Sequence, residues 1–186
     1  MSLKDFKKDI LNDVKVELAD EFDQNFERKA FFTKPWKRER KNPAAKGSLM
    51  QVRGGGGLRG SIRATVDSDS VRFTSSKPYA RIHNEGGEIT VTKAMKAHFW
   101  GEVAKLQPRA ENRTKSGKLT KAAERMSDHV QFCKAMALKK VGSKIKMPQR
   151  QFIGHAPEVD NAVKKIVNKH VEAHAAQVAK LMNPRR

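Results

Sequence analysis

Residues 3–31 carry an apolar side chain at every fourth position, and no glycine or proline interrupts this run. The repeating apolar residues are Phe6, Ile10, Val14, Leu18, Phe22 and Phe26. This spacing is typical of a helix and not of a strand. Four residues exceed one helical turn by about 40°, so the stripe winds around the helix. We therefore expect the N-terminal segment, residues 1–31, to form one long helix that crosses its support obliquely.

A second stripe on the same helix is acidic and contains Asp5, Asp9, Asp13, Glu17 and Glu21. Like charges at this spacing repel one another. The chain as a whole has a net charge of +19, from 39 basic and 20 acidic residues. This distribution favours an anionic partner, or contact between the acidic helix and a basic surface of the same or a neighbouring copy. A charged surface that only keeps the protein soluble is the alternative.

Cysteine content and apolar runs limit the classes of protein to which the chain can belong. Its single cysteine, Cys133, builds neither a disulfide framework nor a cysteine-based metal site. No apolar run approaches the roughly 18–20 residues of a membrane span. The first ten residues alternate charges where a signal peptide would be apolar. We expect a soluble protein made in the cytoplasm, without a cofactor or a membrane partner.

The middle of the chain predicts a linker followed by strands. Residues 32–57 are basic, contain two prolines and end in four consecutive glycines, which favours a flexible linker. A phosphate-binding loop would need lysine and serine or threonine after the glycines, whereas Leu58 and Arg59 follow here. Residues 58–92 alternate apolar and polar side chains, which predicts a hairpin and a third strand.

The second half of the chain is mainly helical in pattern. Residues 93–139 read as a helical insertion, and residues 140–182 as a fourth strand, a loop and a last helix beginning at Pro157. The predicted fold is a single α+β domain spanning residues 1–186. In it, a small antiparallel sheet is packed by the long N- and C-terminal helices, and the helical insertion projects from the sheet.

Two sets of histidines are candidates for chemistry. His83 with Glu85 would form a base and its partner only in extended backbone, because a spacing of two separates side chains on a helix. A structural histidine beside a turn is the preferred reading. His170 and His174 lie one helical turn apart and would face one metal ion, but no further ligand completes the set. We expect them to be solvent-facing helix residues, and we predict neither a metal site nor an enzyme.

A basic segment around Trp36 is the candidate nucleic-acid contact. An aromatic ring flanked by cations can stack on bases while the charges hold phosphates. The residues concerned are Lys34, Trp36, Lys37, Arg38, Arg40 and Lys41. The cationic loop from Arg109 to Lys121 would add to such a patch. Charge alone gives only binding that ignores sequence.

The stretch "PYARIHNEGG", residues 78–87, is better explained as architecture. Pro78 ends the preceding strand and can open a turn. Asn84, Gly86 and Gly87 permit backbone angles that other residues avoid. We predict a short turn of helix followed by a glycine corner that leads into the third strand.

Three motifs in order resemble the phage virion morphogenesis family. They are "GLRGSI" at residues 57–62, "YARIHNEGG" at residues 79–87 and "PQRQFIG" at residues 148–154. The family pattern has glycine, leucine, serine and isoleucine in the first, tyrosine, alanine, histidine and two glycines in the second, and proline, arginine, phenylalanine and glycine in the third. The matching residues are Gly57, Leu58, Ser61, Ile62, Tyr79, Ala80, His83, Gly86, Gly87, Pro148, Arg150, Phe152 and Gly154. The chain departs from the pattern in its four-glycine run, in Gln151, and in residues 93–139.

The resemblance implies a non-enzymatic protein of tailed phages and prophages that acts in tail completion and head–tail joining. The implied partners are tail-tube, neck or connector subunits, with a homo-oligomeric ring and non-specific DNA contact as further expectations. The implied location is the host bacterial cytoplasm during assembly and then the virion. A basic nucleic-acid-binding module is the alternative function. We expect the motif residues to serve folding, and Arg150 to hold the loop before the last helix to the sheet.

Overall fold

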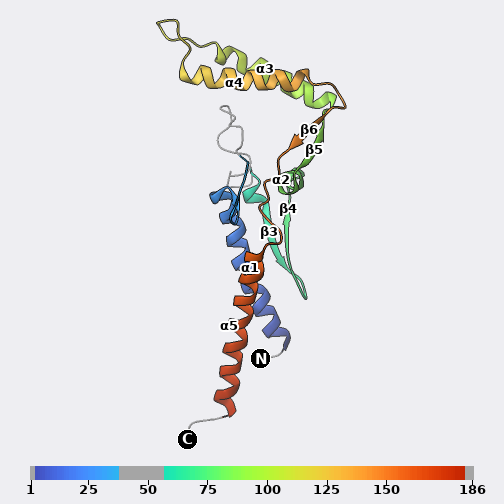
Figure 1. The fold of residues 1–186 in the computed structure, drawn as a ribbon, viewed down its shortest axis with the longest axis vertical. Coiled ribbons are helices and arrows are strands. Elements are labelled where there is room, and N and C mark those ends of the chain that lie inside the picture. Colours follow the sequence, from blue (N-terminus) through green and yellow to red (C-terminus); the bar gives the residue numbers. More distant parts are fainter. Residues whose placement is uncertain (1–2, 38–56, 183–186) are drawn as a thin grey trace.

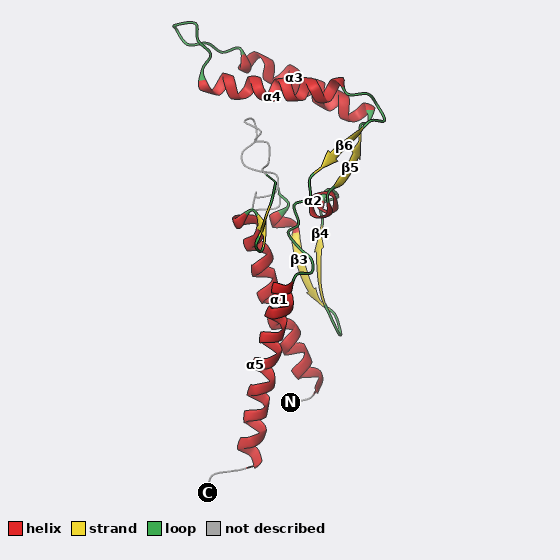
Figure 2. Cartoon of the chain, viewed as in Figure 1, coloured by secondary structure: helices red, strands yellow, loops and turns green. Residues whose placement is uncertain are grey.

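The computed structural model describes residues 3–37 and 57–182, and these form an α+β fold, as predicted (Figure 1). Figure 2 shows that helices make up most of it. The helices are α1 (Leu3–Arg28), α2 (Ala80–Glu85), α3 (Lys93–Ala110), α4 (Lys121–Leu138) and α5 (Pro157–Met182), with a 3₁₀ turn at Arg59–Ser61. The strands are β1 (Ala30–Phe31), β2 (Lys34–Pro35), β3 (Ile62–Val66), β4 (Val71–Ser75), β5 (Gly87–Thr90) and β6 (Lys144–Met147).

The two long helices α1 and α5 cross obliquely, as the winding apolar stripe predicts (Figure 1). Val14, Leu18 and Phe22 of α1 are buried in one cluster with Phe31 and Ala156. Burial of apolar surface of this kind is the main favourable term in folding. Asp13 of the acidic stripe also pairs with His170 of α5 at 2.9 Å. The N- and C-terminal helices therefore form the support for each other.

Helix α1 ends three residues before the predicted boundary. Lys29 has a positive φ of 54°, which no helix continues. The chain then reverses through the short hairpin of β1 and β2, in which Ala30 pairs with Pro35. The segment expected to be linker from residue 32 therefore starts as ordered hairpin. Its later part, residues 38–56, lies outside the described residues, and so do three of its four glycines.

The expected single sheet is two separate antiparallel ladders. One is the predicted hairpin of β3 and β4, in register from Ile62 opposite Ser75 to Val66 opposite Val71. The other joins β5 to β6, with Gly87 opposite Met147. The ladders do not merge because α2 and the glycine corner lie between β4 and β5 and turn the chain away. The predicted turn of helix is α2, and Gly86 at its end has a φ of 73°.

Helices α3 and α4, residues 93–138, form a hairpin that we call the arm. Its own apolar cluster contains Val103, Leu106, Ala110, Val130 and Cys133. The arm enters and leaves the β5–β6 ribbon at neighbouring residues, because Val91 N–H donates to Ser143 and Gly142 N–H donates to Val91. In Figure 1 the arm lies across the far end of this ribbon, away from α1 and α5. No described helix is long and apolar enough to cross a membrane.

Candidate functional site

The three motifs meet at one buried junction, formed where the loop after β6 crosses the end of α1. Phe26 of α1, Leu58 and Phe152 are each 0 % exposed and pack together. The ring centroids of Phe26 and Phe152 are 5.1 Å apart. Ile62, Tyr79, Ala80 and Ile153 surround this trio. Residues from the entry to the hairpin, from the glycine corner and from the last loop thus share one small core.

Side chains from two helices satisfy the backbone of the last loop. Asn84 of α2 accepts hydrogen bonds at Oδ1 from the N–H groups of Phe152 and Ile153, at 2.9 and 3.2 Å. Asn25 of α1 donates from Nδ2 to the Phe152 carbonyl at 3.2 Å and accepts from Phe32 N–H at 2.9 Å. Asn25 is 0 % exposed. A buried peptide group without a partner is costly, so these amides fix the path of the loop.

Arg150 also anchors this loop, through both its backbone and its side chain. Its backbone N–H donates to the His83 carbonyl at 2.7 Å. Its buried guanidinium donates from Nε to the carbonyl of Lys37 at 3.0 Å. Lys37 follows strand β2, so Arg150 ties α2 and the last loop to the segment after the N-terminal hairpin. The contact with Lys37 was not expected, because that segment was assigned to a linker, and a tie of Arg150 to the sheet stays a prediction.

The first motif is fixed by a turn and by an ion pair. Ser61 Oγ donates to the Leu58 carbonyl at 2.7 Å and lies 2.7 Å from Ser75 Oγ on β4. Gly57 and Leu58 are buried, and Ile62 begins β3. Arg59, between them, bonds to Asp23 with two nitrogens and to Glu27 at 2.9 Å. The hydrogen bonds to Asp23 raise the pKa of Arg59, so this cation stays charged.

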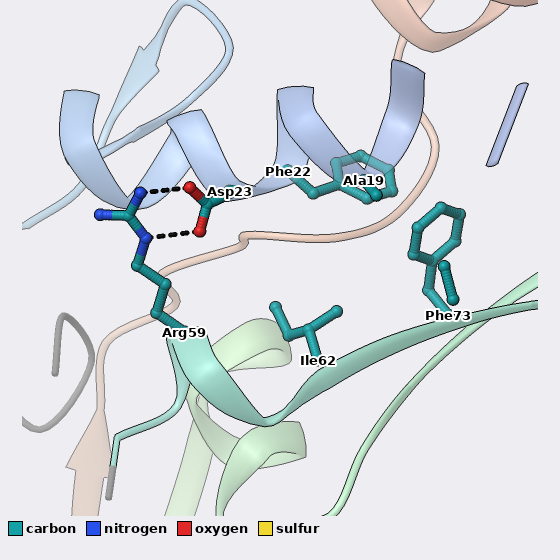
Figure 3. Close-up of a pocket in the computed structure, with 7 residues that line it drawn as sticks. Ala19, Phe22, Asp23, Arg59, Ile62 and Phe73 are labelled. Carbon is teal, nitrogen blue, oxygen red and sulfur yellow. Dashed lines mark hydrogen bonds and ion pairs between the residues drawn. The ribbon is translucent and has the colours of Figure 1, made fainter. Parts of the chain in front are cut away.

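A small hollow of about 120 Å³ adjoins this ion pair, between α1 and β3 (Figure 3). Phe22 and Phe73 stand at its far side with ring centroids 4.9 Å apart, edge to face. Ile62 closes its floor, while Asp23 and Arg59 occupy the opposite wall (Figure 3). The hollow is smaller than a typical ligand pocket. We interpret it as a gap in the packing of α1 on the β3–β4 hairpin.

The motif glycines and proline permit close packing at the corner. A Cβ on Gly86 would lie 3.0 Å from the Gln149 nitrogen, and a Cβ on Gly87 would lie 3.0 Å from Ile82. Both glycines have positive φ. Pro148 directly follows β6 and has no N–H to continue the ladder. Gly154 has a φ of 142° just before α5. The glycine corner can therefore lie directly against the last loop.

His83 occupies a structural position in this corner. It lies on α2, is 9 % exposed and packs edge to face on Tyr79, with ring centroids 5.9 Å apart. Glu85 bonds instead to Arg81 at 2.9 Å, a pairing that raises the pKa of the exposed Arg81. Because this segment is helical, the arrangement of His83 with Glu85 as base and partner is not formed.

A family comparison identifies the chain. The phage virion morphogenesis family matches residues 4–172. The chain belongs to this family. No curated protein matches, and no solved structure matches either. The match confirms the resemblance that rests on the three motifs, and it extends beyond them to α1, the arm and most of α5.

The sequence did not reveal all the residues that bond to the motif segments. Asn25, Asp23 and Arg59 were not singled out by any pattern. The available signal for Asn25 was its position three residues after Phe22, which places a polar residue on the apolar side of α1. Asn84 was assigned only to the corner, whereas its side chain holds the last loop.

His170 and His174 of α5, which lie outside the family motifs, contact side chains of α1. His170 bonds to Asp13 at 2.9 Å, and both His170 and His174 contact the ring of Phe6. The expectation that this pair faces solvent is therefore wrong for His170, which packs on α1. Among the described residues, no group of three or more histidine, cysteine or acidic side chains could hold a metal ion.

Trp36, the aromatic residue of the predicted nucleic-acid patch, packs against the buried junction. Trp36 packs edge to face on Phe26 at 5.5 Å and donates from Nε1 to the Gln151 carbonyl at 2.6 Å. This position does not favour stacking on a base. Lys34 and Lys37 are exposed, whereas Arg38, Arg40 and Lys41 lie outside the described residues.

Proposed function

We propose that this protein completes the phage tail and joins it to the head, acting as a structural component and not as an enzyme. The observation that carries the proposal is the family match over residues 4–172, together with the meeting of all three motifs at one core. The motif residues serve to hold four segments of chain together. This leaves the outer surfaces of the helices to bind partners.

The partners that we propose are tail-tube, neck or connector subunits, and neighbouring copies of the protein in a ring. The shape of the molecule supports this. In Figure 1 the arm lies beyond the β5–β6 ribbon, and the lower end of α5 extends past α1. Val171, Val178 and Leu181 on α5 are 50 %, 40 % and 80 % exposed. Exposed apolar side chains that recur along a projecting helix are typical of a surface that binds another protein.

A genetic experiment tests the proposed step. Deleting the gene from its prophage should leave separate heads and unfinished or unjoined tails in induced lysates, as seen by electron microscopy. Supplying the gene from a plasmid should restore joined particles. Normal virions from the deletion strain would show that the protein acts elsewhere.

A mixing experiment separates a structural component from a catalyst. Purified protein is added in increasing amounts to lysate of the deletion strain, and infectious particles are counted. A structural component should act in proportion to the amount added until its positions are filled, and it should then be found in purified virions. We expect it in the host cytoplasm before assembly and in the tail or neck afterwards. Full restoration by a trace amount, with no protein in the virions, would favour catalysis.

A further inference from the structure

The tip of the arm is a hydrogen-bonded turn that carries two exposed lysines. Gly117 N–H donates to the Thr114 carbonyl at 2.9 Å, and Thr114 N–H donates to the Lys118 carbonyl at 2.7 Å. Arg113 closes the turn by donating to the Gly117 carbonyl at 2.9 Å. Lys115 and Lys118 are exposed, and neither forms an ion pair with a described residue. A fixed turn holds these two charges at the end of the arm.

An acidic cleft of about 300 Å³ lies between the second half of α1 and the start of α5, beside the turn of the β1–β2 hairpin. Leu18, Phe32 and Ala162 give it apolar walls, and Glu17, Glu21 and Glu158 line it with carboxylates. Glu21 is paired with Arg28 at 2.6 Å, and Glu158 accepts only a long bond of 3.4 Å from Thr33. Glu17 is exposed and forms no ion pair within the described part of the chain.

The chemistry of the acidic cleft matches a long cationic side chain. A lysine buries its methylene stem on apolar surface while its ammonium group stays near charge and water. The apolar walls of the cleft suit the stem, and the carboxylates of Glu17 and Glu158 suit the ammonium group. The partner that fits this cleft is therefore an exposed basic turn.

The arm tip and the acidic cleft of one chain do not meet. In Figure 1 the arm lies beyond the β5–β6 ribbon, and its tip stands apart from α1 and α5. Two surfaces of opposite charge that stand apart on one molecule favour head-to-tail contact between copies. Contacts of this type build a ring when the rotation closes.

We propose that the arm tip, through Lys115 and Lys118, inserts into the acidic cleft of a second copy of this chain. This contact rests on the proposed assembly role and specifies the interface through which copies join. DNA binding by the arm would use the same lysines, but it would give the acidic cleft no role. The two proposals therefore differ in whether substitutions in the acidic cleft weaken binding.

Complementary charge reversals in the full chain test the contact. One variant carries Lys115→Glu and Lys118→Glu, and the other carries Glu17→Lys and Glu158→Lys. Nuclease-treated protein is examined by sedimentation velocity at low salt, with circular dichroism to verify folding. We expect the wild type to associate, and each variant alone to associate about tenfold more weakly or worse. An equal mixture of the two variants should regain association, because each reversed tip then meets an oppositely charged cleft.

The control variant carries Lys139→Glu and Lys140→Glu, which make the same change of charge at the base of the arm. It should associate like the wild type. The proposal is overturned if the wild type is a monomer at low salt, if either variant associates normally, or if the mixture fails to associate. Loss of duplex DNA binding by the tip variant, without a change in self-association, would assign the arm to DNA instead. The gene deletion tests the assembly role separately. If the deletion strain lacks joined particles, the assembly role stands even where this contact is overturned.

Discussion

At the scale of single residues, the junction depends on side-chain amides that replace backbone partners. Asn84 accepts two hydrogen bonds from the last loop, and Asn25 donates to the same loop from the opposite side. Neither residue would be identified by hydrophobicity. Their importance comes from the peptide groups that they satisfy, which belong to segments far away in the sequence.

Replacing Asn84 should therefore destabilise the protein strongly. Asn84→Ala removes the acceptor of two partly buried N–H groups, and we expect a loss of about 1–3 kcal/mol in the free energy of unfolding. Urea denaturation followed by circular dichroism measures this loss. Asn168→Ala, on the exposed side of α5, is the matched control and should change stability by less than about 0.5 kcal/mol. Equal effects of the two substitutions would contradict the role of Asn84.

The glycine corner gives a second test at this scale. Gly86→Ala would place a Cβ 3.0 Å from the Gln149 nitrogen on backbone with a φ of 73°. We expect a loss of at least about 1–2 kcal/mol. Gly101→Ala is the control, because Gly101 lies within α3 and its Cβ would meet open space. That change should stabilise α3 by about 0.5–1 kcal/mol, so the two substitutions should shift thermal unfolding in opposite directions.

At the scale of secondary-structure elements, the long helices, the hairpin and the corner were predictable, because periodicity and glycine chemistry act locally. The partly buried position of Trp36 was not predictable. In the sequence, an aromatic residue among lysines is typical of a binding surface. The partner of Trp36 in the structure, Gln151, lies 115 residues further along the chain. His170 was misplaced for the same reason, since its neighbours Asp13 and Phe6 belong to the first helix. The separation of the sheet into two ladders also depends on tertiary position.

The arm has an apolar cluster of its own, so it should respond to mutation separately. Val130 is 3 % exposed between α3 and α4, and Val130→Ala should weaken the arm by about 1–3 kcal/mol. Hydrogen exchange with mass spectrometry should show faster exchange in residues 93–138 and unchanged exchange in α1 and α5. Faster exchange throughout the chain would show instead that the arm unfolds together with the rest of the described chain, which we call the body.

At the scale of the whole molecule, body and arm are joined by one two-stranded ribbon. The arm begins and ends beside the hydrogen-bonded pair of Val91 and Ser143. Its removal therefore requires no new path for the rest of the chain. Replacing residues 93–140 with a short Asn-Gly turn should keep β5 paired with β6, since such turns are favoured in hairpins.

We expect this armless protein to remain folded, with thermal unfolding of the body within a few degrees of that of the full chain. Nuclear magnetic resonance or hydrogen exchange would verify that the junction persists. The armless protein should fail to restore joined particles in the deletion strain, because it lacks a projecting surface. A body that unfolds without the arm would show that the two are energetically coupled, and restored particles would show that the arm is dispensable.

The junction also sets the order of events as the chain is synthesised. Asn25 and Phe152 are separated by 127 residues, so Phe26 can reach Phe152 only after most of the chain has been made. At roughly 5–20 residues per second, the ribosome needs about 6–25 s to make this stretch. Throughout that interval the part of the apolar stripe that packs on α5 is not yet covered by that helix. The carboxylates along the same helix then act as protection against aggregation, which gives the acidic stripe a use before the protein has folded.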